Sequence, residues 1–310
     1  MPFSDRLFAA IREKGTPVLA GIDPRAESLP PGFLVGFGAD RPSVARAFAA
    51  FSRDVIDALA PLVPAVKFQA AFFEALGPEG MIALGDALAY ARSRGMLVIL
   101  DGKRNDIGST AEAYATAYMG PDGGWEADAL TINAYLGVDG IAPFVRAGAE
   151  HDTGAFVLVR TSNPSARDLQ DLRVGDRPLY RHVADLVTQW GADHRGKSGY
   201  SLLGAVVGAT YPQELAELRE VMPGVVLLVP GYGAQGGTAA DVASAFDADG
   251  LGAIVNNSRG LAFAYLRKDL AARFGDRWQR AVEAAAIEMI EALASATPAG
   301  RLRAPGSNPA

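Results

Sequence analysis

Short runs of apolar residues recur along the chain, and each run ends in polar residues or glycine. Eight of these runs have the length of strands and show little alternation, which is typical of parallel strands buried on both faces of a sheet. They lie at residues 18–23, 65–69, 96–103, 129–134, 155–161, 202–209, 225–231 and 252–258. The pattern therefore predicts an eight-stranded parallel sheet.

Between these runs, apolar residues recur at three- and four-residue spacing, as in helices that pack with one face. The spacing predicts helices over 44–60, 80–95, 109–119, 180–193, 211–224 and 237–250. In the third of these, Ser109 followed by Glu112 predicts a capping box. Eight strand–helix units in the α/β class indicate a (β/α)8 TIM barrel, with a doubly wound open sheet as the alternative. The strand count and the polar residues after each strand favour the barrel.

Two connections are longer than usual loops and follow strands, on the side where barrels build their sites. They span 24–43 and 162–200, and we interpret them as insertions in a single barrel domain over 1–295. The remaining segment, 296–310, is rich in Pro, Gly and Ala, and is expected to be disordered.

Composition narrows the classes of function. The 310 residues are 49% hydrophobic and 21% charged, with a net charge of -6 and no basic run, so nucleic acid is not expected as a partner. The chain has no cysteine, which excludes disulfides and thiolate chemistry. No uncharged apolar run reaches the length of a membrane span, and the first residues lack the apolar core of a signal peptide. We therefore expect no membrane partner and a cytoplasmic location.

The stretch "LVILDGKRNDIG", residues 97–108, runs from buried apolar residues directly into charge. Asp101 and Lys103 are two positions apart in a strand, so both should point into the mouth of the barrel. Lys67 ends the neighbouring strand, which brings two lysines and a carboxylate to one place. A structural salt-bridge network is the alternative, but buried networks are seldom net stabilisers.

Other polar residues also follow strands. The glycine-rich "PGYGAQGG" (230–237) leads toward a predicted helix, and "NNSRG" (256–260) follows the last strand. Loops in these positions of a barrel often bind phosphate through backbone N–H groups, and Arg259 adds a bidentate donor. The same rule, that residues at or after the carboxyl ends of barrel strands form the site, also selects Asp23, Asp106, Asn133, Thr161, Ser162 and Gln235. The three histidines show no paired spacing, and the sequence predicts no metal site.

These residues resemble the orotidine 5′-phosphate decarboxylase family. "DGKRND" (101–106) is similar to its D-x-K-x-x-D motif, and Lys67 in "VKFQ" makes the resemblance more specific than the motif shared with related sugar-phosphate enzymes. The resemblance extends from "GIDPR" to "NNSRG", and the long 162–200 segment with "GAQGG" resembles the longer bacterial branch, type 2.

The resemblance implies a role for each residue. Lys103 would protonate the carbon that carbon dioxide leaves, Asp101 would lie against the substrate carboxylate, and Lys67 and Asp106 would complete an alternating set of charges. Substrate contacts would come from Asp23, Thr110, Ser162, Pro230, Gln235 and Arg259. It also implies a homodimer, in which Asp106 and Thr110 serve the partner's site, and the absence of any metal or organic cofactor.

Three rival functions use the same residues. A metal-dependent sugar-phosphate aldolase would need a carboxylate ligand where Lys67 stands. A Schiff-base aldolase would need a neutral lysine, whereas neighbouring carboxylates keep a lysine protonated. A non-catalytic protein that binds a phosphate-bearing ligand is the third.

Overall fold

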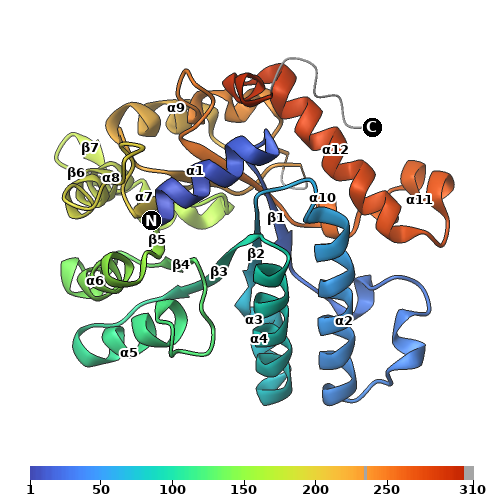
Figure 1. The fold of residues 1–310 in the computed structure, drawn as a ribbon. Coiled ribbons are helices and arrows are strands. Elements are labelled where there is room, and N and C mark those ends of the chain that lie inside the picture. The colour runs from blue at the N-terminus through green and yellow to red at the C-terminus, as the bar shows by residue number, and fades with distance from the viewer. Residues whose placement is uncertain (234–235, 304–310) are drawn as a thin grey trace.

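The computed structural model describes residues 1–233 and 236–303 of the chain. Eight parallel strands close into a barrel in the order β1-β10-β9-β8-β5-β4-β3-β2. The strands are β1 (Val18–Ile22), β2 (Ala65–Gln69), β3 (Leu97–Arg104), β4 (Ala129–Ile132), β5 (Gly154–Arg160), β8 (Leu203–Val207), β9 (Leu227–Val229) and β10 (Ala253–Asn257). Because β1 pairs with both β2 and β10, the sheet has no open edge. The predicted barrel is confirmed and the open sheet is wrong (Figure 1).

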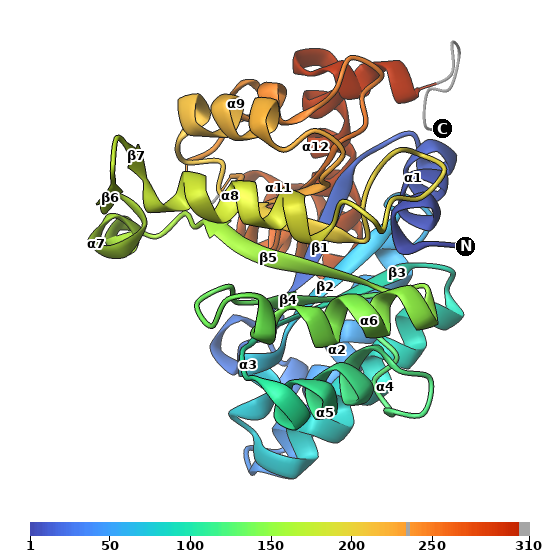
Figure 2. The same ribbon diagram turned by 90° about the vertical axis from the view of Figure 1, so that its left-hand side faces the viewer.

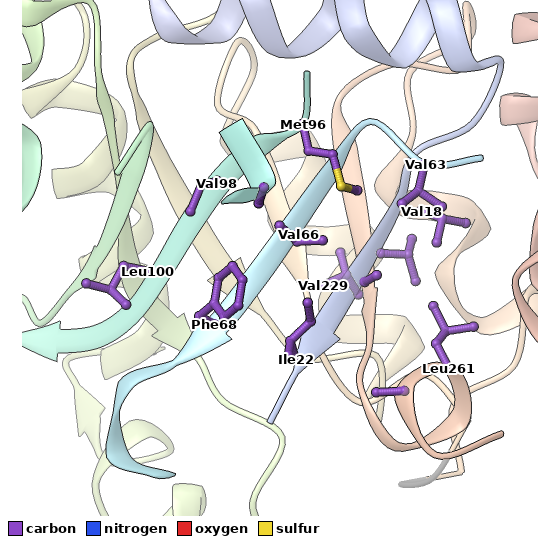
Figure 3. Close-up of a cluster of buried hydrophobic side chains, with 14 of the residues drawn as sticks. Val18, Ile22, Val63, Val66, Phe68, Met96, Val98, Leu100, Val229 and Leu261 are labelled. Carbon is purple, nitrogen blue, oxygen red and sulfur yellow. The ribbon is translucent and has the colours of Figure 1, made fainter. Parts of the chain in front are cut away.

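Helices surround the barrel. They are α1 (Phe3–Lys14), α2 (Arg41–Leu59), α3 (Ala70–Glu74), α4 (Gly77–Ser93), α5 (Gly108–Met119), α6 (Ala142–His151), α7 (Arg167–Gln170), α8 (Leu179–Trp190), α9 (Pro212–Val221), α10 (Arg259–Ala262), α11 (Lys268–Phe274) and α12 (Trp278–Ala296). Their apolar faces cover the outward side chains of the strands, including Val66, Val98 and Val229 (Figure 3). The alternation of strand residues thus divides the core into an outer layer and a barrel interior.

Two local predictions are wrong. The helix predicted over 237–250 is a short 3-10 helix, Ala240–Ala245, because the chain turns extended at the buried Phe246 on its way to β10. The capping box is also absent: α5 begins at Gly108 after an N-cap at Ile107 that has no side-chain bond. Ser109 therefore lies inside the first turn, where its helical backbone prevents it from acting as the N-cap.

One end of the barrel is closed by α1. Phe3, Leu7, Phe8 and Ile11 of this helix join the inward residues of the strands in a second buried cluster. Phe3 packs edge-on against Phe156 of β5, with ring centroids 5.9 Å apart. This apolar cluster occupies the amino ends of the strands and leaves the carboxyl ends for polar residues.

The two insertions add structure at the carboxyl ends. The 24–43 segment carries the short 3-10 helices Ala26–Ser28 and Phe33–Gly36. The 162–200 segment carries α7, α8 and a hairpin of β6 (Arg173–Val174) and β7 (Arg177–Pro178). Figure 2 shows α7 and this hairpin projecting beyond the end of β5.

The predicted disordered tail is wrong for its first residues. Pro298–Leu302 form a 3-10 helix, in which Ala299 is buried and the Thr297 side chain accepts from the Ala299 N–H. The remainder of the tail, 304–310, lies outside the described residues. Within the part of the chain that is described, no helix has the length and apolar character to cross a bilayer.

Candidate active site

A cavity of about 690 Å³ opens at the carboxyl ends of the barrel strands. Its floor is the top of the apolar interior, where Leu158, Val206 and Leu228 line it. The polar walls come from residues at or near the carboxyl ends of β1, β2, β3, β4, β5, β9 and β10. Of the predicted site residues, the cavity brings together Asp23, Lys67, Asp101, Lys103, Thr161, Ser162, Pro230 and Arg259.

Asp101 is the centre of the polar floor. Its Oδ2 accepts from Lys67 Nζ at 2.9 Å and from Gln69 Nε2 at 3.2 Å. Its Oδ1 accepts from Lys103 Nζ at 2.6 Å and from the Thr131 hydroxyl at 2.8 Å. Four donors from three adjacent strands therefore hold one carboxylate in a single orientation.

The charges of this cluster are set by burial and by each other. Burial alone would raise the pKa of Asp101, but the ammonium groups of Lys67 and Lys103 hold that pKa well below its ordinary value. Burial alone would lower the pKa of Lys67, but the carboxylates of Asp101 and then Asp23 raise it. Asp101 is thus an anion and Lys67 a cation at neutral pH, although both are buried.

Lys103 differs from Lys67 in exposure. Its side chain is 45% exposed, against 4% for Lys67, so its ammonium group faces the open cavity. The predicted alternation is confirmed, since Lys103 and Asp101 lie on the same side of β3. The backbone at Lys103 is left-handed, with φ of 47°, an uncommon conformation for a residue other than glycine.

Two contacts support this unusual backbone. The Thr131 hydroxyl accepts the Lys103 N–H at 2.9 Å, so the same threonine fixes both the backbone of the lysine and the carboxylate of Asp101. Arg104 points to the outside of the barrel, donates to the Gly102 carbonyl at 2.9 Å, and pairs with Glu74 of α3. The end of β3 is therefore held from both faces.

The opposite part of the cavity has free hydrogen-bonding groups. Pro230, Gly231 and Tyr232 line it after β9, and Asn256 to Arg259 line it at the end of β10 and directly after it. Arg259 is exposed there at the first position of α10. Gln235, which was also predicted here, lies outside the described residues. The 3-10 helix Ala240–Ala245 takes the place of the helix expected to follow this loop.

Asp23 and Asn256 each have a buried side-chain oxygen without a hydrogen-bond partner among the described residues. Buried acceptors of this kind are normally satisfied, so oxygens that line a cavity are suited to hydroxyl or N–H groups of a ligand. Gly21 brings the two strands that carry them together. A Cβ at Gly21 would lie 1.8 Å from Ser258 Oγ, so only glycine fits at this contact between β1 and the end of β10.

Asp106 and Thr110 do not line this cavity within the described part of the chain. Asp106 Oδ1 accepts its neighbour's N–H, that of Ile107, at 2.8 Å, and Thr110 is exposed on α5. Asn133, another predicted residue, also lies outside the lining, and its Oδ1 accepts the Tyr135 N–H at 2.9 Å.

Several lining residues were not predicted. Thr131 could have been found, because it lies two positions after the inward Ala129 in the strand next to Asp101. Gln69 has the same relation to Lys67. Arg25 gave no comparable signal, because it lies in an irregular insertion and reaches the cavity only through the fold.

Comparisons with known proteins agree on one family. The model of the "Orotidine 5′-phosphate decarboxylase / HUMPS family" matches residues 35–273. Orotidine 5′-phosphate decarboxylase of Rhodopirellula baltica is 50% identical over 94% of this chain and 99% of its own, and that of Caldicellulosiruptor saccharolyticus is 44% identical over 85% and 90%. The solved structure of Leishmania donovani OMP decarboxylase is similar with a TM-score of 0.74 and 34% identity, covering 98% of this chain and 100% of that one.

The charge balance of the cluster predicts how stability depends on pH when Asp101 is neutralised. In Asp101→Asn, Lys67 stays buried without its main counter-charge, and we expect a loss of about 3–5 kcal/mol in the free energy of unfolding at pH 7. Burial should then hold the pKa of Lys67 below its unfolded value. The variant should therefore regain stability as the pH rises toward the ordinary lysine pKa of 10.5, whereas the unchanged protein should not.

Urea denaturation from pH 7 to pH 9.5 measures this difference. The double variant Lys67→Met, Asp101→Asn is the control, since it has no lysine at position 67 to titrate and should show no such rise. A stability of Asp101→Asn that is independent of pH over this range would contradict the assigned charges.

Proposed function

The chain belongs to the orotidine 5′-phosphate decarboxylase family, and on that premise we propose that the cavity converts orotidine 5′-phosphate to UMP, the decarboxylation step of de novo pyrimidine biosynthesis. The observation that carries the proposal is the Asp101 carboxylate held between Lys67 and Lys103 at the floor of a cavity. A fixed anion flanked by two cations suits a reaction in which one negative charge leaves and another forms.

The proposed reaction breaks the bond between C6 of the pyrimidine and its carboxylate. Carbon dioxide leaves, the electron pair stays on C6, and Lys103 transfers a proton from its ammonium group to that carbon. An ammonium group fixed beside the developing anion stabilises the transition state electrostatically before it donates. Such terms contribute to the roughly 8–23 kcal/mol by which enzymes commonly lower a barrier. Because Lys103 is 45% exposed, water can return the proton to it afterwards.

Asp101 and Lys67 have separate roles in this proposal. The Asp101 anion lies where the substrate carboxylate would approach, and repulsion between them falls as carbon dioxide forms. Lys67 offsets the burial of Asp101 and keeps its carboxylate charged, and the Lys67 side chain itself is only 4% exposed. The two lysines around one carboxylate therefore divide into a structural partner and a proton donor.

The remaining cavity residues suit the rest of the nucleotide. Arg259 and the backbone after β9 would bind the phosphate, with Pro230 and Gln235 in the same loop. The unpartnered oxygen of Asp23 would accept from ribose hydroxyls, and Ser162 would contact the base. Contacts to the phosphate, far from C6, provide binding energy that organises the site around the base.

We also propose a homodimer, in which Asp106 and Thr110 act in the partner's site. Both residues lie beside the cavity rather than in it, next to an exposed apolar surface. This surface comprises Ile107, Tyr135, Leu136 and Val138, of which Tyr135 is 75% exposed. Exposed apolar residues that gather at one place commonly mark a protein interface. The cytoplasmic location expected from the sequence remains a prediction.

The aldolase rivals receive less support from the same site. The carboxylates of Asp101 and Asp23 raise the pKa of Lys67 against the effect of its burial. A high pKa disfavours the neutral amine that a Schiff base requires. Loss of orotidine 5′-phosphate absorbance on addition of the purified protein separates decarboxylation from both aldolases and from a protein that only binds. No loss of absorbance would reject the proposed function.

Lys103→Ala should lower kcat by on the order of 10⁴-fold or more, because the variant lacks both the proton donor and the adjacent cation. Its affinity for UMP should stay within about threefold, since phosphate and ribose contacts remain. Titration calorimetry and the absorbance assay measure the two effects. Lys197→Ala, an exposed lysine that contacts α1 through its backbone, is the control. Activity of Lys103→Ala within tenfold of the unchanged protein would exclude its assigned role.

Arg259→Ala should raise KM for the nucleotide by about 10- to 100-fold, the loss expected for a charge-assisted contact to phosphate. It should hardly affect turnover of the nucleoside, which has no phosphate. Arg280→Ala, an exposed arginine of α12, is the control. An equal effect of Arg259→Ala on nucleoside and nucleotide would show that Arg259 does not bind phosphate.

Lys103→Ala and Asp106→Ala should each be inactive alone but active when unfolded and refolded as an equal mixture. In a two-fold dimer each subunit lends the same surface to the other. Half of the dimers would then be mixed, with one intact site each, so activity should return to about a quarter by random pairing. No recovery, with mixed dimers shown by mass spectrometry, would place Asp106 in its own subunit's site.

A further inference from the structure

The segment that follows β5 forms one wall of the cavity. Ser162, Asn163, Ser165, Ala166, Leu169 and Gln170 all line it. Half of these residues are exposed, and α7 at the end of the segment has only four residues, so the wall has little core of its own. Its position must therefore come from contacts where the segment leaves and rejoins the barrel.

Arg160, the last residue of β5, lies at that point. By alternation it should face the interior like Leu158, but the register shifts between Leu158 and Arg160, so that two steps along β5 match one step along β8. This extra residue turns Arg160 to the outside of the barrel. The side chain is nevertheless 2% exposed, which makes it a fully buried cation.

The Arg160 guanidinium joins the wall to the barrel. Its Nε and Nη2 bind Glu214 of α9 at 2.5 Å and 3.1 Å, a bidentate pair. Its Nη1 lies 2.6 Å from Asp171 Oδ1, directly after α7. The rings of Tyr180 and Tyr211 lie over the guanidinium at 5.1 Å and 4.7 Å from their centroids.

A second contact lies beside the first. The Gln170 amide donates to the Thr161 hydroxyl at 2.8 Å, and its oxygen accepts the Thr161 N–H at 3.0 Å. Thr161–Gln170 and Arg160–Asp171 are therefore adjacent cross-links that close the segment at its base. Without Arg160, the carboxylates of Asp171 and Glu214 would be left close together with no cation between them, which would separate the segment from α9.

We propose that Arg160 is a positioning residue, which acts through Asp171 to hold residues 161–171 as a preformed wall against the bound base. The proposal rests on the proposed function, because it assigns this wall to the base end of the nucleotide. Arg160 does not line the cavity, so it acts only through the segment it holds. If the wall is in place only part of the time in the free protein, the apparent Kd equals the intrinsic Kd divided by that fraction, so the affinity falls.

The test compares Arg160→Met and Asp171→Asn with Arg181→Met. Arg181 is the matched control, because it pairs with Glu217 at 2.7 Å between α8 and α9 and makes no bond to the wall. Hydrogen exchange of peptides over 161–172 should be at least tenfold faster in the first two variants and unchanged in the third. Exchange over β8, residues 203–207, should stay unchanged in all three.

Kinetics with orotidine 5′-phosphate provide the second measurement. Arg160→Met and Asp171→Asn should raise KM tenfold or more, with kcat within about threefold and an unchanged pH profile, because the reacting groups stay in place. Unchanged exchange over 161–172 would overturn the proposal, and so would faster exchange with KM within twofold. If Arg160→Met does not fold, Asp171→Asn decides, since its side chain is 44% exposed. Absence of turnover in the unchanged protein would instead reject the proposed function, and hydrogen exchange would still show whether Arg160 holds the wall.

Discussion

The site depends on keeping one carboxylate charged although it is buried. Asp101 is buried, so its anion is tolerated only because four donors surround it, two of them ammonium groups. Those donors stand on β2, β3 and β4, which are neighbours in the barrel. A cluster of this kind is a poor source of stability, because desolvation of the ions offsets much of their attraction. Its geometry is better understood as a fixed electric field for chemistry.

The barrel accommodates this charged cluster because its interior is divided into two zones. The amino ends of the strands hold an apolar cluster closed by Phe3, Phe8 and the rest of the inner face of α1. The carboxyl ends hold the polar floor and the open cavity. Because the apolar zone and the outer layer of helices supply the packing, the residues at the carboxyl ends are free to be charged, unpartnered or strained.

The ends of β3 and β5 are held in place in a similar way. Both β3 and β5 lose their regular register just before an arginine, Arg104 in one case and Arg160 in the other. Each arginine lies over two tyrosine rings and pairs with carboxylates on the surrounding elements. The contacts of Arg104 support the left-handed backbone of Lys103 in β3, and the contacts of Arg160 hold the segment that follows β5 and begins with Thr161 and Ser162. The outer face of the sheet thus controls the geometry of its mouth.

The sequence determined the features that depend on local pattern. Eight buried runs predicted the strands, and strand alternation alone placed Asp101 and Lys103 on one side of β3, facing Lys67. Five of the six helices predicted between the strands are present near their expected bounds. The same rule could have found Thr131 and Gln69, because both follow the alternation of predicted strands.

Tertiary structure decided the rest. The register shift that turns Arg160 outward arises from pairing with β8, which no local pattern encodes. The closure of the barrel by α1 and the fit of Gly21 against Ser258 join segments that are far apart in the chain. Alternation and helical spacing are properties of neighbouring residues, whereas register, closure and burial of a charge depend on which distant strand or helix lies alongside.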